Sequence, residues 1–319
     1  MPMFGYFLSC EEHRPEELIR QARLAEEAGF EALWISDHFH PWTDEQGQSP
    51  FVWSVIGALS QAVSLPVTTA VTCPTVRIHP AIIAQAAATS QVMLDGRFRL
   101  GVGTGEALNE HILGDRWPSA AERLDMLAEA VEVIRALLGG HQISHHGRYY
   151  TVDTARLYTL PETPPPIHVS GFGPKSAAAA GRIGDGFMTS KPDPDLIRAF
   201  RDAGGEGKPL MAGLKACWGP DEAQAVKTAH RLWKNEQIPG QAGQELPLPA
   251  HFAQVAQLVP EDTVRDAVPC GPQVDRHLQA IRPLVDAGFD EIYINQIGPE
   301  PDGFFDFYHR EVLPRLRGH

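Results

Sequence analysis

The feature that most constrains the fold is the alternation of short apolar runs with amphipathic helical patterns along the chain. Eight apolar runs of strand length are predicted, over residues 4–8, 32–35, 67–71, 98–102, 167–169, 186–189, 210–218 and 290–297. Eight strands that alternate with helices favour a (β/α)8 TIM barrel. A doubly wound sheet is the alternative, and eight units fit it less naturally.

Helices are predicted between these runs because apolar residues recur there with helical spacing. In the stretch 15–28, Leu18, Ala22 and Ala25 share one face, and Gly29 follows as a typical helix end. Further helices are predicted over residues 51–64, 80–93, 121–138, 175–182, 194–203, 274–287 and 304–316.

Two stretches interrupt this rhythm. Residues 139–166 contain histidines, tyrosines and three consecutive prolines, which suggest a hairpin or an excursion from the barrel. Residues 220–268 are long for one strand–helix unit, and their middle, 238–249, is rich in glycine and proline. We therefore predict one TIM-barrel domain over residues 1–319, with a lid-like insertion at about 220–268 before the last strand.

Composition narrows the classes of partner. The chain of 319 residues is 43% hydrophobic and carries a net charge of −13 without a basic cluster, which argues against nucleic acid and anionic membrane surfaces. We find no apolar run of membrane-spanning length and no signal-peptide pattern, so a soluble cytoplasmic protein is expected. The four cysteines are far apart, which favours free buried thiols over a zinc site or disulfides.

Reactive side chains follow the second predicted strand. The run that begins at Trp34 leads directly into Asp37, His38, His40 and Trp42. Residues that follow barrel strands converge on one face, where such enzymes place their chemistry. His38 is a candidate general base, with a loop cap as the alternative, because imidazole titrates near neutral pH. Trp42 is a candidate pocket wall or a packing residue, and His40 is expected to be structural.

Glycine loops follow two other strands. Gly103 to Gly105 leads into Glu106, which is either an acid partner for His38 or a carboxylate at a helix N-terminus. The loop 170–173 opens a helix, where free backbone N–H groups suit a phosphate; a simple tight turn is the alternative. Neither loop has the spacing of a Rossmann or Walker motif.

The pair His38-Phe-His40 also raises the possibility of a metal-dependent hydrolase. Such a site needs further histidine or aspartate ligands at later strand ends. Those ends offer glycines, Ser170 and Lys191 instead, so no metal site is predicted.

Taken together, five stretches resemble the bacterial luciferase-like superfamily of flavin and deazaflavin oxidoreductases. They cover residues 36–42 (SDHFHPW), 69–74 (TAVTCP), 79–85 (HPAIIAQ), 101–109 (GVGTGEALN) and 184–187 (GDGF), in the order of the family. The resemblance extends over nearly the whole chain. It is strongest to the branch that includes the F420-dependent glucose-6-phosphate dehydrogenases, and to a sister group of flavin-type oxidoreductases that do not use F420.

This resemblance implies a role for each matching residue. His38 is the implied base for a substrate hydroxyl, and Trp42 and Glu106 flank the reacting carbon. A non-proline cis peptide is implied between Ala70 and Val71. The implied cofactor contacts are Asp37, Val71, Thr72 and Cys73 at the ring, Asn109 at the ring or ribityl chain, and Ser170, Gly171, Phe172 and Gly173 at the phosphate.

The substrate phosphate site of the sugar-phosphate dehydrogenases is matched only in part. Those enzymes use two lysines and an arginine, for which Lys191 and Arg265 are the candidate substrate-binding residues here. The second lysine has no counterpart between residues 239 and 252. Because charge-assisted contacts to phosphate are strong, this loss argues against glucose 6-phosphate as the substrate.

The resulting hypothesis is an oxidoreductase that transfers a hydride between FMN or F420, with FMN slightly preferred, and a small organic substrate. A monooxygenase that uses reduced FMN is the first alternative, and a non-catalytic flavin-binding protein is the second. The resemblance also implies a homodimer.

Overall fold

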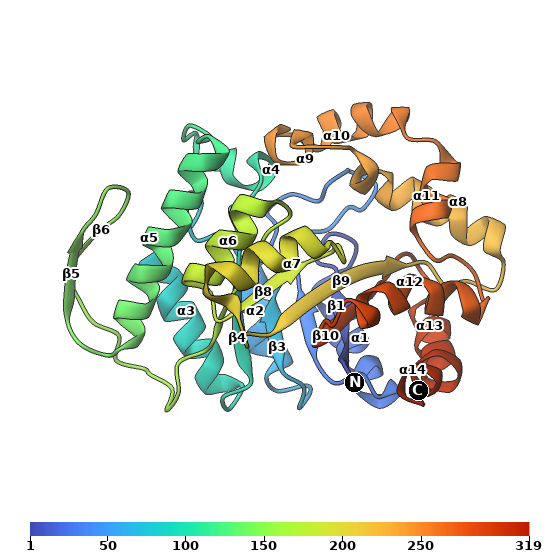
Figure 1. Cartoon of the computed structure of the whole chain (residues 1–319), viewed down its shortest axis with the longest axis horizontal. Coiled ribbons are helices and arrows are strands. Elements are labelled where there is room, and N and C mark those ends of the chain that lie inside the picture. The colour runs from blue at the N-terminus through green and yellow to red at the C-terminus, as the bar shows by residue number, and fades with distance from the viewer. Residues whose placement is uncertain (319) are drawn as a thin grey trace.

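The computed structural model describes residues 1–318 and confirms the closed parallel barrel. Its strands are hydrogen-bonded in the order β1-β10-β9-β8-β7-β4-β3-β2, and β2 closes on β1 (Figure 1). Their bounds are β1 (Met3–Leu8), β2 (Leu33–Ile35), β3 (Val67–Thr69), β4 (Phe98–Val102), β7 (Ile167–Ser170), β8 (Gly186–Thr189), β9 (Leu210–Ala216) and β10 (Glu291–Gln296).

Helices cover the outside of the barrel and follow the strands in turn. They are α1 (Pro15–Ala28), α2 (Val52–Leu59), α3 (Pro80–Met93), α5 (Ala120–Leu138), α6 (Pro174–Ile183), α7 (Pro194–Phe200), α12 (Val274–Asp286), α13 (Pro301–Phe307) and α14 (Leu313–Arg317). The local signals act as expected at α1, which starts with Pro15 and ends at Gly29 in the left-handed conformation (φ 90°).

Several predicted elements are shorter than expected. The helix predicted over 51–64 ends at Leu59, because the chain turns at Ser60 before β3 begins. The third strand ends at Thr69, and the bond between Ala70 and Val71 is a cis peptide, as the resemblance implied. The strand predicted over 210–218 ends at Ala216.

The interruption at residues 139–166 contains the predicted hairpin, formed by β5 (Ile143–His146) and β6 (Thr151–Ala155). It lies outside the barrel beside α5, at the left of Figure 1. Glu129 of α5 accepts backbone N–H bonds from Arg148, Tyr149 and Tyr150 between the two strands. The hairpin is therefore attached through this carboxylate and through apolar residues, such as Tyr150 and Val152, that belong to the core.

The second interruption is more helical than its glycine and proline content suggested. We call residues 222–267 the inserted segment. It contains α8 (Glu222–Trp233), α9 (Ala242–Glu245), α10 (Pro249–Val255) and α11 (Glu261–Ala267), with short helical turns at 234–237 and 256–258. Its short helix α9 is attached to the buried Arg123 of α5, whose guanidinium donates to Gln244 and Glu245 at 3.1 Å.

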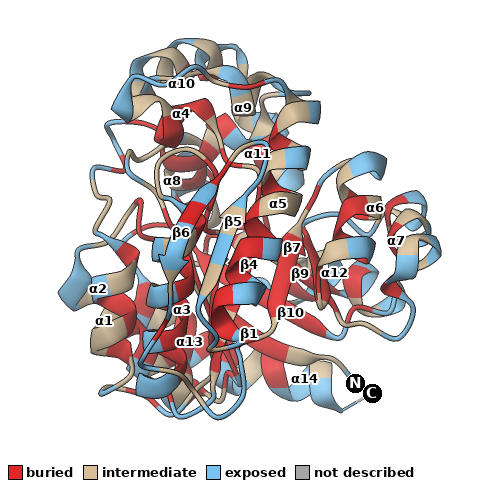
Figure 2. Ribbon diagram, turned by 90° about the vertical axis from the view of Figure 1, so that its left-hand side faces the viewer, coloured by how far each residue is buried: buried red, intermediate tan, exposed pale blue. Residues whose placement is uncertain are grey.

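Among the described residues the core has three parts, one between helices and strands, one inside the barrel and one beneath α8 and α11. Buried residues are red in Figure 2. Inside, the indole of Trp34 stacks on the ring of Tyr293, with centroids 4.2 Å apart. All four cysteines are free and buried, as predicted. Within residues 1–318 we find no helix with the length and apolar character of a membrane span.

Candidate active site

A buried carboxylate stands at the end of β2, where a polar site was predicted. Asp37 accepts a hydrogen bond from the Thr72 hydroxyl, which follows β3, at 2.8 Å. Its other oxygen pairs with a guanidinium nitrogen of Arg77 at 2.9 Å. The chain thus joins the predicted ring residues Asp37 and Thr72 directly, and it adds Arg77, which sequence reasoning did not identify.

Arg77 is shared between two buried carboxylates. Besides Asp37, it contacts Glu110, the last residue of the short helix α4 (Ala107–Glu110), through its backbone N–H at 2.7 Å and its Nε at 3.4 Å. Burial raises the pKa of Glu110 to about 7, against the opposing charge of Arg77. The positive charge of Arg77 is therefore fully engaged by protein groups.

His38 is held from several sides at the same mouth. Its Nδ1 lies 3.1 Å from the carbonyl oxygen of His40 and 3.1 Å from the side-chain nitrogen of Asn109. The side-chain oxygen of Asn109 accepts the backbone N–H groups of Phe39 and His40, at 2.9 and 3.1 Å. Asn109, 71 residues further along the chain, thereby fixes both the loop after β2 and the imidazole.

The opposite nitrogen of His38 faces a second buried carboxylate. Nε2 lies 3.5 Å from Glu11, which follows β1 and accepts hydrogen bonds from the hydroxyls of Ser9 at 2.8 Å and Ser36 at 2.7 Å. Burial raises the pKa of Glu11, but His38 and these hydroxyls lower it by more, so the net pKa lies below its usual value. Glu11 is therefore ionised beside His38 near neutral pH.

Trp42 and Glu106 lie at the edges of this cluster. The Trp42 and His38 ring centroids are 5.0 Å apart, and Trp42 also meets the buried Phe252 of α10 edge to face at 5.1 Å. Glu106 stands at the N-cap of α4, and its Oε2 is 3.5 Å from the side-chain nitrogen of Asn109. Trp42 thus lies beside His38, whereas Glu106 is connected to it only through Asn109, and their predicted roles toward a substrate stay predictions. We call the set Glu11, Asp37, His38, Trp42, Arg77, Glu106, Asn109 and Glu110 the His38 cluster.

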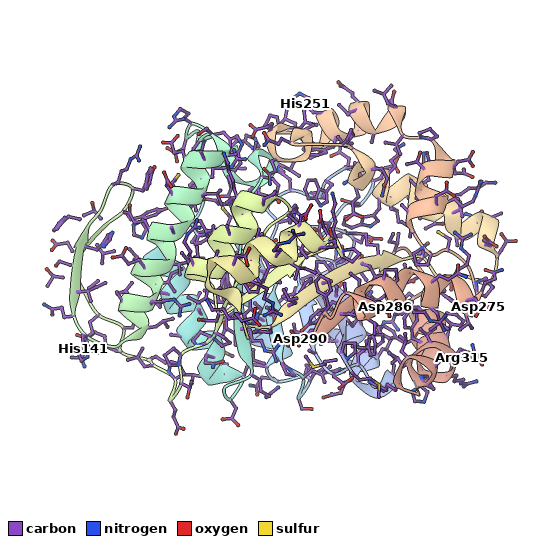
Figure 3. All side chains as sticks on the ribbon, in the orientation of Figure 1. His141, His251, Asp275, Asp286, Asp290 and Arg315 are labelled. Atoms are coloured by element: carbon purple, nitrogen blue, oxygen red, sulfur yellow. The ribbon has the colours of Figure 1, made fainter. Side chains whose placement is uncertain are left out.

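His40 has a structural position. Its Nδ1 contacts the carbonyl oxygen of Leu108 at 2.9 Å, which ties the loop after β2 to α4. Other histidines lie apart from the cluster. His141, near the hairpin, and His251, on α10, lie toward the outside of the molecule (Figure 3). Within residues 1–318 no group of three or more His, Cys, Asp or Glu side chains is arranged to hold a metal ion.

The glycines after β4 are required by close packing. A Cβ on Gly103 would lie 2.7 Å from a methyl group of Val71, and one on Gly105 would lie 2.6 Å from the sulfur of Cys73. Gly105 also has a φ of +72°, a conformation that disfavours other residues. Cys73 is buried, and burial raises its pKa well above the usual range, so its thiol is not a nucleophile.

The loop after β7 differs, because it faces open space. A Cβ on Gly173, the N-cap of α6, would meet no atom within 4 Å, and the neighbouring Phe172 is exposed. The first N–H groups of a helix have no acceptor inside that helix. Within Ser170 to Gly173, the N–H of Gly171 donates to the carbonyl of Met188 and that of Gly173 to the hydroxyl of Ser176. The donors left for a phosphate are therefore the N–H groups at the start of α6, and the predicted phosphate role of this loop stays a prediction.

The two candidate substrate cations are not part of the His38 cluster. Arg265 lies on α11 and pairs with Asp262 at 2.5 Å and Glu261 at 3.4 Å, carboxylates of its own helix. Lys191 is exposed after β8. Neither side chain contacts the cluster within the described residues.

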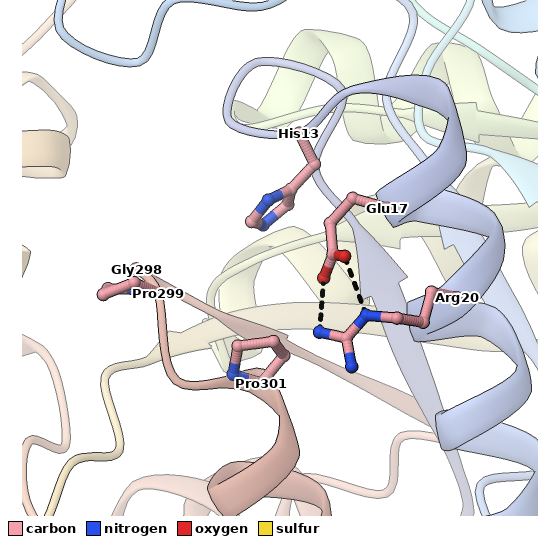
Figure 4. Close-up of a pocket in the computed structure, with 6 residues that line it drawn as sticks. All are labelled: His13, Glu17, Arg20, Gly298, Pro299 and Pro301. Atoms are coloured by element: carbon pink, nitrogen blue, oxygen red, sulfur yellow. Dashed lines mark hydrogen bonds and ion pairs between the residues drawn. The ribbon is translucent and has the colours of Figure 1, made fainter.

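A separate hollow of about 270 Å³ lies where the loops after β1 and β10 meet (Figure 4). Its charged lining groups are paired with one another, since Glu17 and Arg20 form an ion pair at 2.8 Å. None of its lining residues belongs to the His38 cluster, so the hollow is not part of the candidate active site.

Comparisons with known proteins show which family and which enzymes the chain is similar to. The family described as luciferase-like monooxygenase matches residues 3–291. The chain is 35% identical to the F420-dependent glucose-6-phosphate dehydrogenase of Microbacterium testaceum, over 98% of this chain and 97% of the relative. It is 38% identical to the F420-dependent hydroxymycolic acid dehydrogenase of Mycobacterium tuberculosis, over 98% and 88% of the two chains.

A solved structure is similar over the full length. It is an F420-dependent secondary alcohol dehydrogenase in complex with an F420–acetone adduct, 33% identical to this chain, with a TM-score of 0.91. The similarity covers 98% of this chain and 99% of that one.

Proposed function

Because the chain belongs to the luciferase-like monooxygenase family, we propose that it is an F420-dependent dehydrogenase of an uncharged alcohol. The membership and the dehydrogenase relatives establish an oxidoreductase that transfers a hydride. F420 is preferred over FMN because the three relatives described above, at 33–38% identity, depend on F420. The observation that carries the proposal is His38 held between an ionised Glu11 and Asn109.

The residues present fit such a cofactor. The open space at Gly173 and the N–H groups at the start of α6 would take its phosphate. Asp37, Val71 and Thr72 would contact the ring at the ends of β2 and β3, with Cys73 beside them and Asn109 near the ring or its side chain. When bound, the cofactor supplies the ring position that accepts or gives the hydride.

Proton transfer is assigned to His38. Nε2 can accept a proton in the tautomer whose Nδ1–H donates to the carbonyl of His40, and Nε2 then has only one long contact, 3.5 Å to Glu11. In this tautomer the side-chain nitrogen of Asn109, which is itself a donor, makes no hydrogen bond with Nδ1. Nε2 would take the proton from the oxygen of the substrate hydroxyl, while the hydride leaves the carbon that bears this hydroxyl. The imidazolium formed is stabilised by the adjacent carboxylate of Glu11. Glu106 and Trp42 would flank the reacting carbon, with Glu106 as a polarising acid.

The charge of the mouth supports an uncharged substrate. The His38 cluster contains four carboxylates and one guanidinium, and that guanidinium is paired with Asp37 and Glu110. Arg265 is paired within its own helix. An anionic substrate would therefore meet carboxylates without a free cation from the cluster, which costs free energy. A neutral hydroxyl compound carries no such penalty.

The test adds F420 and FMN separately to the purified protein and follows absorbance and fluorescence. Binding of F420, followed by its reduction with secondary alcohols but not with sugar phosphates, is the expected result. If FMN alone binds, and a substrate gains an oxygen atom when it is supplied together with reduced FMN and oxygen, the protein is a monooxygenase instead. Failure of both cofactors to bind below about 1 mM, a very weak affinity, would refute the proposal.

A further inference from the structure

The inserted segment is joined to the barrel mouth at the end of α8. Trp233, the last residue of α8, is only 3% exposed, and Glu236 follows in the next turn. Both side chains have charged partners on the barrel, namely Lys215 of β9 and Glu12 in the loop after β1. None of these four residues belongs to the His38 cluster, so the proton transfer proposed above does not explain them.

Lys215 faces the inside of the barrel at its C-terminal end. Side chains alternate between the two faces of a strand. On the same face of β9, Met211 packs in the barrel interior, and a Cβ on Gly213 would meet the Trp34 ring at 2.8 Å. The Lys215 side chain is only 13% exposed, which is unusual for a lysine without a partner.

The charge of Lys215 is used by the inserted segment. Its ammonium lies 3.9 Å from the centroid of the Trp233 ring and forms an ion pair with Glu236. A desolvated cation over an indole is attracted to the ring face, and the ion pair neutralises its charge. Lys215 is therefore suited to holding this segment rather than to binding an anionic ligand.

Glu12 holds the same indole at its edge. Its carboxylate accepts the Nε1–H of Trp233 through one oxygen and the backbone N–H of Gly298 at 3.0 Å through the other. Gly298 follows β10, so the first and last strands of the barrel meet at Glu12. The indole of Trp233 is thus fixed on its face by one barrel element and on its edge by another.

We propose that Lys215 and Glu12 are positioning residues that hold the inserted segment over the barrel mouth through Trp233 and Glu236. We call these four residues the latch. The inserted segment in turn holds Trp42, the proposed wall of the pocket. The side-chain nitrogen of Gln46 donates to the carbonyl oxygen of Leu232 at 2.9 Å. The side-chain oxygen of the same glutamine accepts the backbone N–H of Trp42.

A second contact links the same segment to the wall, because Phe252 of α10 packs edge to face on Trp42. Loss of the latch should therefore loosen the substrate pocket while leaving His38 in place. The effect on catalysis rests on the proposed dehydrogenase function, whereas the effect on the segment does not.

The test compares Lys215→Met with Lys227→Met, an exposed lysine of α8, as the matched control. Amide hydrogen exchange of residues 232–258 should become roughly tenfold faster in Lys215→Met and stay unchanged in the control. With an alcohol substrate, KM should rise roughly tenfold while kcat changes less than threefold. Lys215→Arg should keep both the exchange rate and KM close to those of the original chain, since a guanidinium also stacks on indole and pairs with a carboxylate.

The outcomes separate the two proposals. Faster exchange without activity toward any alcohol would support the latch and refute the dehydrogenase. Unchanged exchange and unchanged KM in Lys215→Met would refute the latch, and so would weaker binding of inorganic phosphate as the sole effect, which would make Lys215 an anion receptor. If Lys215→Met does not fold, Glu236→Gln decides by the same exchange measurement.

Discussion

Buried charged groups have different roles on the two sides of the barrel mouth. On the side of β1, β2 and β4, the His38 cluster surrounds one imidazole with polar partners from three strand-end loops. On the side of β9, the latch surrounds one indole with charges and has no proton-transfer partner for a substrate. The comparison suggests that the first side controls the chemical step, and that the second controls the shape of the pocket.

The strongest test of this division is His38→Ala. If His38 takes the hydroxyl proton, kcat should fall by about 10²–10⁴-fold, the usual size of a general-base contribution. The affinity for F420, measured by fluorescence, should change little. His141→Ala, an exposed histidine near the hairpin, serves as the control and should keep full activity. A fall in kcat of less than threefold for His38→Ala would end the general-base assignment.

A second test uses the pH dependence of stability on the His38 side. The pKa of Glu110 is raised from 4.5 to about 7, so between these values the folded protein binds a proton that the unfolded chain does not. The contribution of Glu110 to stability should therefore fall by roughly 3 kcal/mol as pH rises through this window. His168 and His277 contribute in the opposite direction, because burial lowers the pKa of each from 6.5 to about 4.

In urea unfolding between pH 4.5 and 8, the unfolding free energy of Glu110→Gln should change with pH along a slope more positive than that of the original chain. The contributions of Glu12, whose pKa burial raises to about 7, and of His168 and His277 are present in both chains and cancel in this difference. Glu132→Gln, an exposed position on α5, is the control and should keep the original slope. A slope that is identical in Glu110→Gln and the original chain would contradict the assignment.

A third test concerns Trp42, the proposed pocket wall that the inserted segment holds, and it uses Phe252→Ala. Removing this ring takes away the edge-to-face partner of Trp42, and such aromatic pairs contribute about 0.5–1.5 kcal/mol. We expect KM for an alcohol to rise roughly two- to tenfold with kcat nearly unchanged. His251→Ala, the preceding residue on α10, is the control. A large loss of kcat instead would mean that the two sides of the mouth are not separable.

The smallest effect is expected for Arg265→Ala. Its exposed pairs with Glu261 and Asp262 lie within one helix, and such pairs contribute about 0.3–0.5 kcal/mol. Neither KM for an uncharged alcohol nor the unfolding midpoint should change appreciably. A clear rise in KM for a phosphorylated substrate would restore Arg265 to the substrate-binding role that the family resemblance implies.

Local patterns predicted the barrel because each strand and helix carries its own apolar periodicity. They also placed His38, Glu106 and Asn109 at one mouth, since barrel strands end at one face. Glu11 could have been found by the same argument, because it follows the first strand. Lys215 had a weaker signal, as a charge within an otherwise apolar strand.

Other features had no local signal. Arg77 lies in a loop, and its role becomes visible only in the folded protein, where its guanidinium pairs with Asp37 and Glu110. The inserted segment was predicted as a lid-like insertion from its length and its glycine- and proline-rich middle, and no helix was predicted within it. Its helices are held instead by side chains from distant parts of the chain. Arg123 of α5 donates a hydrogen bond to Glu245 of α9, and Glu12 accepts one from the indole of Trp233. Contacts of this kind depend on the finished fold, not on neighbouring residues.

Closure of the barrel also has a consequence for biosynthesis. β1 pairs with β10, and the side chain of Asn295 donates to the carbonyl of Phe7 across 288 residues of chain. While the ribosome is still making the C-terminal part, β1 lacks this neighbour, and Glu12 lacks the N–H of Gly298. We therefore expect a chain that stops before β10 to show no cooperative unfolding transition, and the mouth to be the last part of the protein completed.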